Sequence, residues 1–218
     1  PAFSEVLGGL ILEEVLSTCA ADPTPARTVE RLVLEPLGLG SVAFDAEGAR
    51  RLRDSGLMSV PFGGLPDRPV PLLSELLHGV DELRPAFGVV CAARDFGRFF
   101  EACRLSLRPD TPDPLLPPGA FAELLTHRHP PFEDRHAERV THMAGGFMVD
   151  AVRNGLSRLA STNSFGHNAG FAQTVGFSDV NNQLTVALYL NGGELGSPQS
   201  RLDRLAAIDE VYRALAVR

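Results

Sequence analysis

The spacing of apolar residues changes near residue 144, and this change limits the possible folds more than any other feature of the chain. Before it, apolar side chains recur every three or four residues, which predicts amphipathic helices. These segments are 6–16, 28–34, 94–107, 120–125 and, more weakly, 74–83. After it, β-forming residues dominate 145–152, 174–177 and 184–190. A last helical pattern at 201–217 completes the order expected of an α+β fold.

Residues that end helices or form turns lie between these segments and predict where the segments end. Pro36 and Gly38 are expected to stop the helix at 28–34, because proline disfavours continuation and glycine permits the turn. The stretch 179–183, Asp-Val-Asn-Asn-Gln, suits a hairpin turn because Asp and Asn tolerate left-handed backbone. In the first helix, Glu13 and Glu14 are expected to face outward.

Composition excludes some classes of partner. The 218 residues are 44% hydrophobic, enough for one ordinary globular core. The net charge of -7 offers no basic field for nucleic acid. No apolar run approaches the roughly 18 residues of a membrane-spanning helix. Three cysteines in apolar surroundings, Cys19, Cys91 and Cys103, suit free thiols and a cytoplasmic protein.

The first residues run abruptly into a helix. Pro1 to Glu5 lead straight into the apolar series that begins at Val6. We therefore expect an upstream segment or separate chain to belong with this one.

The best candidate site precedes the β-hairpin. The segment 164–170, Ser-Phe-Gly-His-Asn-Ala-Gly, carries one imidazole followed by small residues. His167 is suited to donating a hydrogen bond or moving a proton near neutral pH, and the small residues let a substrate approach the backbone. The alternative is that His167 only caps the turn, and the residues by themselves leave both interpretations open.

Several stretches, in order along essentially the whole chain, resemble one family. Residues 164–168 followed by 175–179 (Val-Gly-Phe-Ser-Asp) resemble the third active-site element of class C β-lactamase-like enzymes and family VIII esterases. Three further stretches resemble other segments of that family: 34–38 (Leu-Glu-Pro-Leu-Gly), 84–99 and 212–215. The resemblance implies the serine β-lactamase and penicillin-binding-protein-like superfamily. It also implies a β-lactamase/transpeptidase-like fold, with a helical region at about 1–143 and a sheet hairpin and final helix at about 144–218.

The resemblance also implies that one active-site element is absent. Members acylate a serine in Ser-x-x-Lys, where the lysine helps to remove the serine's proton. All 20 basic residues of this chain, counting arginine and lysine, are arginine. We therefore expect 1–218 to be the carboxy-terminal portion of a single domain, inactive alone, with Ser-x-x-Lys supplied by an upstream segment or chain.

The remaining elements are altered. Phe3-Ser4-Glu5 stands where the family has Tyr-x-Asn, so the proton-relaying phenol is missing and these residues are expected only to line the pocket. The resemblance assigns the catalytic position of the third element to His167. It assigns substrate or oxyanion binding to Asn168, Ala169 and Gly170, with Ala169 in place of the usual glycine and the Gly170 N–H facing the oxyanion.

Two functions remain open. The first is a serine hydrolase or acyltransferase acting on a small-molecule ester, amide or thioester. The family's activities range from antibiotic, ester and peptide hydrolysis to transacylation in biosynthesis. The second is a non-catalytic pseudoenzyme that binds a small molecule or a protein. No metal or cofactor is expected, because the glycine pairs match no phosphate loop and the histidines match no zinc motif. These histidines are His127, His129, His136 and His142.

Overall fold

The computed structural model describes residues 7–20, 22, 24–44, 46–55, 85, 89–117, 119–126, 130–134, 139–169, 174–190 and 197–215. The helices are α1 (Leu7–Ala20), α2 (Pro25–Val29), the π-helical η1 (Glu30–Leu34), α3 (Glu35–Leu37), α4 (Ala46–Asp54), α6 (Ala93–Leu105), α7 (Ala120–Thr126) and α8 (Pro198–Ala214). The strands are β1 (Phe132–Asp134), β2 (Arg139–Thr141), β3 (Met143–Ala144), β4 (Phe147–Val149), β5 (Ser164–Ala169), β6 (Thr174–Asp179) and β7 (Leu184–Tyr189).

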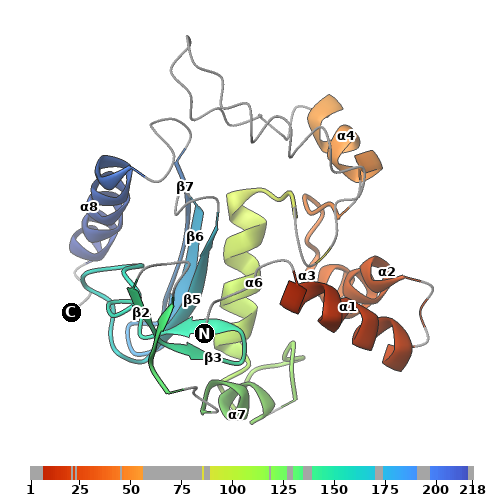
Figure 1. Cartoon of the computed structure of the whole chain (residues 1–218), viewed down its shortest axis with the longest axis horizontal. Helices are drawn as coiled ribbons and strands as arrows, with labels where there is room; N and C mark the ends of the chain where they lie inside the picture. The colour runs from red at the N-terminus through yellow and green to blue at the C-terminus, as the bar shows by residue number, and fades with distance from the viewer. Residues whose placement is uncertain are drawn as a thin grey trace.

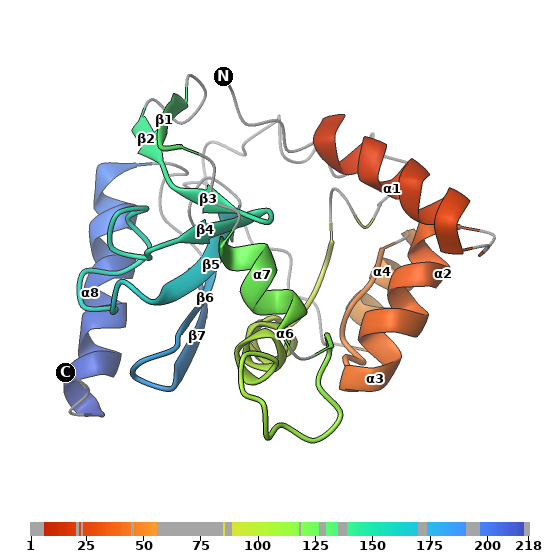
Figure 2. The ribbon, with the colours of Figure 1, turned by 90° about the horizontal axis from the view of Figure 1, so that it is seen from below.

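A five-stranded antiparallel sheet organises the chain. Its strand order is β3-β4-β5-β6-β7, while β1 and β2 form a separate ribbon. Helix α8 covers one face of the sheet and α6 covers the other, with α1 to α4 lying beyond α6 (Figures 1 and 2). The expected α+β fold, an antiparallel sheet flanked by helices, is confirmed.

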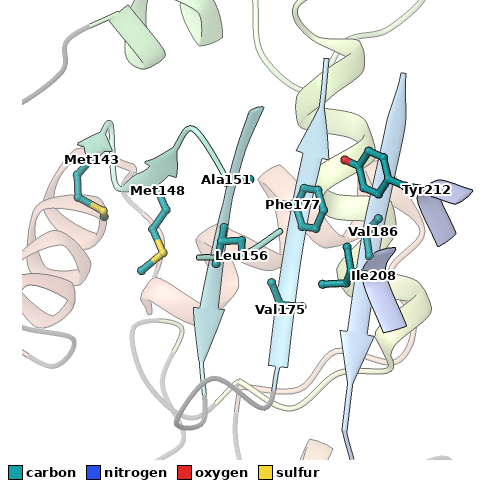
Figure 3. Packing of buried hydrophobic residues seen from close by; sticks show 9 residues of the cluster. All are labelled: Met143, Met148, Ala151, Leu156, Val175, Phe177, Val186, Ile208 and Tyr212. Carbon is teal, nitrogen blue, oxygen red and sulfur yellow. The ribbon is translucent and has the colours of Figure 1, made fainter. Parts of the chain in front are cut away.

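Side chains alternate between the two faces of the sheet, as the period of a strand requires. Val175 and Phe177 pack toward α8 with Ile208 and Tyr212 in one apolar cluster (Figure 3). Phe165 packs on the opposite face in a second cluster, which draws its other members from α6, α7 and the β3–β4 hairpin. Each face of the sheet therefore has its own core.

Helix α1 is longer than expected and is turned differently. Its Ile11 and Val15 side chains are 57% and 51% exposed, whereas Glu13 is only 4% exposed. The prediction that Glu13 faces outward is therefore wrong. Periodicity locates an apolar stripe, but the packing of α1 on α2 decides which side is covered.

The second helical segment also differs from its prediction. Helical backbone begins at Pro25 and passes through Pro36 before ending at Gly38, whose φ is +61°. The π-helical turn Glu30–Leu34 lies just before Pro36. A wider turn relieves the clash between a proline ring and the carbonyl group four residues earlier, so the helix is not stopped there.

Strand positions were only partly anticipated. The expected strands at 174–177 and 184–190 correspond to β6 and β7, but the segment around His167, expected as the entrance to the sheet, is itself strand β5. The hairpin turn is present, with Gln183 rather than an Asp or Asn at positive φ, 52°. The weak helix expected at 74–83 lies outside the described residues.

Helix α8 begins at Pro198 and ends at Ala214, shifted toward the N-terminus from the expected 201–217, and its buried side is different. Ile208 and Tyr212 are buried as expected, whereas Leu202 and Leu215 are 52% and 57% exposed. Arg204 is buried in their place and donates a hydrogen bond to the Gly155 carbonyl oxygen at 2.8 Å. A buried polar contact of this kind leaves no trace in the spacing of apolar residues.

Candidate functional site

The pairing of strand β5 with its neighbour β4 stops at Gly166, one residue before His167. Strand β4 pairs with β5 only at Phe165 and Gly166. Strand β6 pairs with all six residues of β5. Within the described part of the chain, no strand pairs with the outer edge of β5 from His167 to Ala169. A ligand could therefore reach the strand backbone beside a half-buried imidazole.

The side chain of His167 projects toward α6. Its cross-strand partner is Gly176, and directly paired residues point to the same face of a sheet. A Cβ atom on Gly176 would lie 2.5 Å from Phe96 Cε1 and 2.5 Å from Phe100 Cε2. The bare backbone of Gly176 therefore lets α6 approach closely, beside the imidazole. The sequence analysis did not identify Gly176 as a site residue. Only the register of the β5–β6 pair shows that this glycine lies beside His167.

The imidazole is held by its own strand. The Nδ1–H of His167 donates a hydrogen bond to the Asn168 carbonyl oxygen over 2.6 Å. Carbonyl oxygen only accepts, so this contact fixes both the ring orientation and the position of one ring proton. His167 is thus an oriented polar group on a strand.

The other expected site residues are placed differently or lie outside the described residues. Asn168 pairs with Val175, so its side chain is on the α8 face, opposite to His167. Ala169 extends β5 and pairs with Thr174. Gly170 and the altered second element, Phe3, Ser4 and Glu5, lie outside the described residues, as do residues 56–84 and His127, His129 and His136.

A buried carboxylate ties the start of α6 to the chain that precedes it. Asp95 is fully buried and accepts hydrogen bonds from the backbone N–H of Ser41 at 2.9 Å and its hydroxyl at 2.6 Å. Burial acts to raise the pKa of Asp95, but the bonds from Ser41 and Arg94 outweigh it and hold the pKa below its ordinary value. Asp95 therefore holds the start of α6 against Ser41.

A second buried carboxylate joins the end of β6 to the segments around it. Asp179, at the end of β6, accepts hydrogen bonds from Ser161 N–H (2.8 Å), Ser161 Oγ (2.6 Å), Asn182 Nδ2 (2.8 Å) and Tyr212 Oη (2.9 Å). Burial opposes ionisation, yet these bonds keep the pKa of Asp179 below its ordinary value. The pKa of Tyr212 is raised, first by burial and then by its bond to Asp179. Asp179 thereby joins β6, its hairpin, the 161 loop and α8.

Cys91 and Cys103 do not provide a nucleophile in place of the serine. Burial raises the pKa of Cys91 to about 11, with a smaller contribution from the negative charge of Asp95. Burial alone raises the pKa of Cys103 to about 12. Neither thiol is ionised near neutral pH, and the thiolate is the reactive form.

Comparison with protein families shows to which family this chain belongs. A model of the beta-lactamase family matches residues 3–210. The chain belongs to the beta-lactamase family. No curated protein sequence matches this beta-lactamase family member. In the described part of the chain, no helix is both long enough and apolar enough to cross a membrane.

Solved structures show the same beta-lactamase fold at low identity. A family VIII carboxylesterase matches with TM-score 0.70 and 17% identity, over 97% of this chain and 58% of its own. EstA from Arthrobacter nitroguajacolicus Rue61a matches with TM-score 0.68 and 15% identity, over 99% and 61%. EstCE1, described as a hydrolase with promiscuous acyltransferase activity, matches with TM-score 0.64 and 20% identity, over 96% and 55%. The chain spans about three fifths of these structures.

Proposed function

We propose that this chain is the carboxy-terminal portion of a serine hydrolase or acyltransferase that acts on a small-molecule ester, amide or thioester. The observation that carries the proposal is the oriented imidazole of His167, on the stretch of β5 that no described strand pairs with on its outer side. Membership of the beta-lactamase family and the esterase and acyltransferase neighbours support the reaction class. The substrate within that class is left open by the shared fold.

In the proposed reaction, a serine in Ser-x-x-Lys comes from a segment upstream of Pro1. The lysine takes the hydroxyl proton as the serine oxygen bonds to the acyl carbon, and the alcohol, amine or thiol leaves with a proton. Water or a second nucleophile then attacks the carbonyl carbon of the acyl-serine. The acyl group leaves on that nucleophile, and the serine oxygen regains its proton. His167 orients the acyl group by a hydrogen bond, and the backbone N–H of Gly170 faces the oxyanion.

Replacing His167 in the joined protein tests its role. We expect His167→Ala to lower turnover of a chromogenic ester by roughly 100-fold, because an orienting hydrogen-bond group is lost. His142→Ala is the matched control, since His142 is half-buried and its hydrogen bonds with Asn154 are made by the histidine backbone. Turnover that is unchanged in His167→Ala, with folding intact in both variants, would remove His167 from the mechanism.

Covalent labelling tests the source of the nucleophile. A fluorophosphonate should add one label to an upstream serine of the joined protein and none to residues 1–218, as measured by intact mass and peptide mapping. The pseudoenzyme alternative is favoured by Phe3, which lacks the phenol of the family's second element. It predicts no label on any serine while ligand or protein binding is retained.

The open edge of β7 leads to a further prediction. Among the described strands β7 pairs only with β6, yet it is covered by α6 on one face and contributes Val186 to the α8 core on the other. Its sequence, Leu-Thr-Val-Ala-Leu-Tyr, has no charge or proline to discourage pairing. We expect the isolated chain to self-associate in sedimentation velocity and to become monodisperse when the upstream segment is joined. A cooperatively melting monomer of the chain alone would contradict the partial-domain proposal.

A further inference from the structure

We propose that the outer face of α1 is a docking surface for an amphipathic helix that precedes Pro1 in the joined protein. This inference rests on the proposed function, because it names the place where the upstream segment packs. The docking surface, named here the α1 stripe, consists of five exposed residues of one helix face: Ile11, Leu12, Val15, Leu16 and Cys19.

Helix α1 turns apolar side chains toward solvent and an acidic one inward. Leu12 and Leu16 are 64% and 36% exposed, with Ile11 and Val15 exposed beside them, whereas Glu13 is buried. Exposing apolar area and burying a carboxylate both cost free energy. The helix lies on the opposite side of the molecule from α8, with α2 packed against it (Figures 1 and 2). Large apolar side chains gathered on one exposed face mark an interaction surface.

The spacing within the α1 stripe fits a second helix. Ile11, Val15 and Cys19 follow one another at intervals of four residues, and Leu12 and Leu16 form a second row beside them. Rows with this spacing are the ridges of a helix surface, and the groove between two ridges receives a ridge of a facing helix. Neither row contains a charged residue, so the facing helix needs an apolar side of its own.

The part of the fold that this chain lacks favours an upstream helix as the occupant. The chain matches EstA over 99% of its own length but over only 61% of EstA, so the rest of that fold has no counterpart here. Six residues, 1–6, precede α1, and six residues span at most about 20 Å. A helix joined ahead of Pro1 is therefore held near the α1 stripe, at an effective concentration of about millimolar.

Two other occupants fit the observations less well. A second copy of the chain reaches the α1 stripe only at its bulk concentration, below that of a tethered segment. A membrane surface attracts helices through basic residues, and α1 contains no arginine or lysine. The surface therefore fits an apolar helix of the same joined protein.

The thiol of Cys19 reports docking directly. Cys19 is exposed, whereas Cys91 is half-buried and Cys103 is buried. In the joined protein we expect iodoacetamide to alkylate Cys19 at least about tenfold more slowly than in the urea-unfolded protein, as measured by mass spectrometry of the Cys19 peptide. The protection should persist over roughly a hundredfold dilution, because the occupant is tethered. A rate within about twofold of the unfolded rate would overturn the proposal, as would protection that is lost on dilution.

Paired substitutions test whether the α1 stripe itself provides the protection. Glutamine favours helix and is polar, so Leu12→Gln/Leu16→Gln keeps α1 but weakens docking. We expect this variant of the joined protein to alkylate Cys19 within roughly threefold of the unfolded rate. The matched control is Leu202→Gln/Leu215→Gln at α8, where the leucines are 52% and 57% exposed, and it should leave Cys19 protected. Equal rates in the two variants would contradict docking on the stripe.

Cross-linking identifies the occupant. A diazirine analogue of leucine placed at Leu12 of the joined protein reacts, on irradiation, with the side chains that cover it. We expect mass spectrometry to find a cross-linked peptide from the segment upstream of Pro1. Cross-links that lie only within residues 1–218, in the same copy or between copies, would overturn the proposal. Failure of the proposed function is distinguishable, since it would appear as absence of serine labelling while this cross-link is retained.

Discussion

Replacing Asp179 with alanine is expected to lower the free energy of unfolding by about 4 kcal/mol, the largest effect of any single change considered for this chain. The substitution leaves the half-buried donors of Ser161 and Asn182 and the buried hydroxyl of Tyr212 without the carboxylate that accepts from them. A buried donor that loses its partner costs about 1–3 kcal/mol. Urea unfolding followed by circular dichroism measures the difference.

Conservative variants separate this network from packing. Tyr212→Phe removes one hydrogen bond and keeps the ring in the α8 core, so we expect a loss of about 1.5 kcal/mol. Asp179→Asn keeps the size of the side chain but replaces one acceptor oxygen with a donor, and should fall between the other two variants. An Asp179→Ala loss no greater than that of Tyr212→Phe would show that the network contributes little.

The pH dependence of Asp179→Asn checks the sign of the electrostatic contribution. The folded pKa of Asp179 is lower than its ordinary value, so the unfolded chain binds more protons in the acid range. The stabilisation is complete above the unfolded pKa of about 3.9 and is lost as the pH falls through the folded pKa. The difference in unfolding free energy between wild type and Asp179→Asn should therefore shrink below about pH 4. A difference that grows toward acid would contradict the assignment.

Replacing Gly176 with alanine is expected to destabilise the fold by about 2–3 kcal/mol, although only one methyl group is added. That methyl would lie 2.5 Å from ring atoms of both Phe96 and Phe100, so α6 has to move away from β6. Thermal unfolding measures the loss. Because His167 is directly opposite, the chemical shifts of its ring should change as well.

A second glycine at the same interface provides the control. Gly97 on α6 faces β7, where an added Cβ would lie 3.2 Å from Ala187 Cβ. This contact is tight but can be relieved by a small movement, and alanine also favours helix over glycine. We expect Gly97→Ala to change stability by less than about 1 kcal/mol. Equal effects of the two substitutions would show that the close approach at Gly176 does not limit the packing.

The sequence by itself determined the fold class, and it singled out the segment around His167 as the candidate site. The change from a helical to a strand period is a local property, so β6, β7, α6 and α7 were predicted near their observed positions. The resemblance to the β-lactamase superfamily, confirmed by the family match, placed those elements in one architecture. Both kinds of information reside in the order of residues along the chain.

Only the tertiary structure decided which faces are buried and what surrounds His167. Burial of Glu13 and exposure of Ile11 depend on where α2 lies against α1, and the passage of helix through Pro36 depends on the π turn before it. The pairing of His167 with Gly176, and the end of the β4–β5 pairing at Gly166, come from strand register. Register and helix packing join residues far apart in the chain, and the local spacing that predicts a helix or strand carries no information about those contacts.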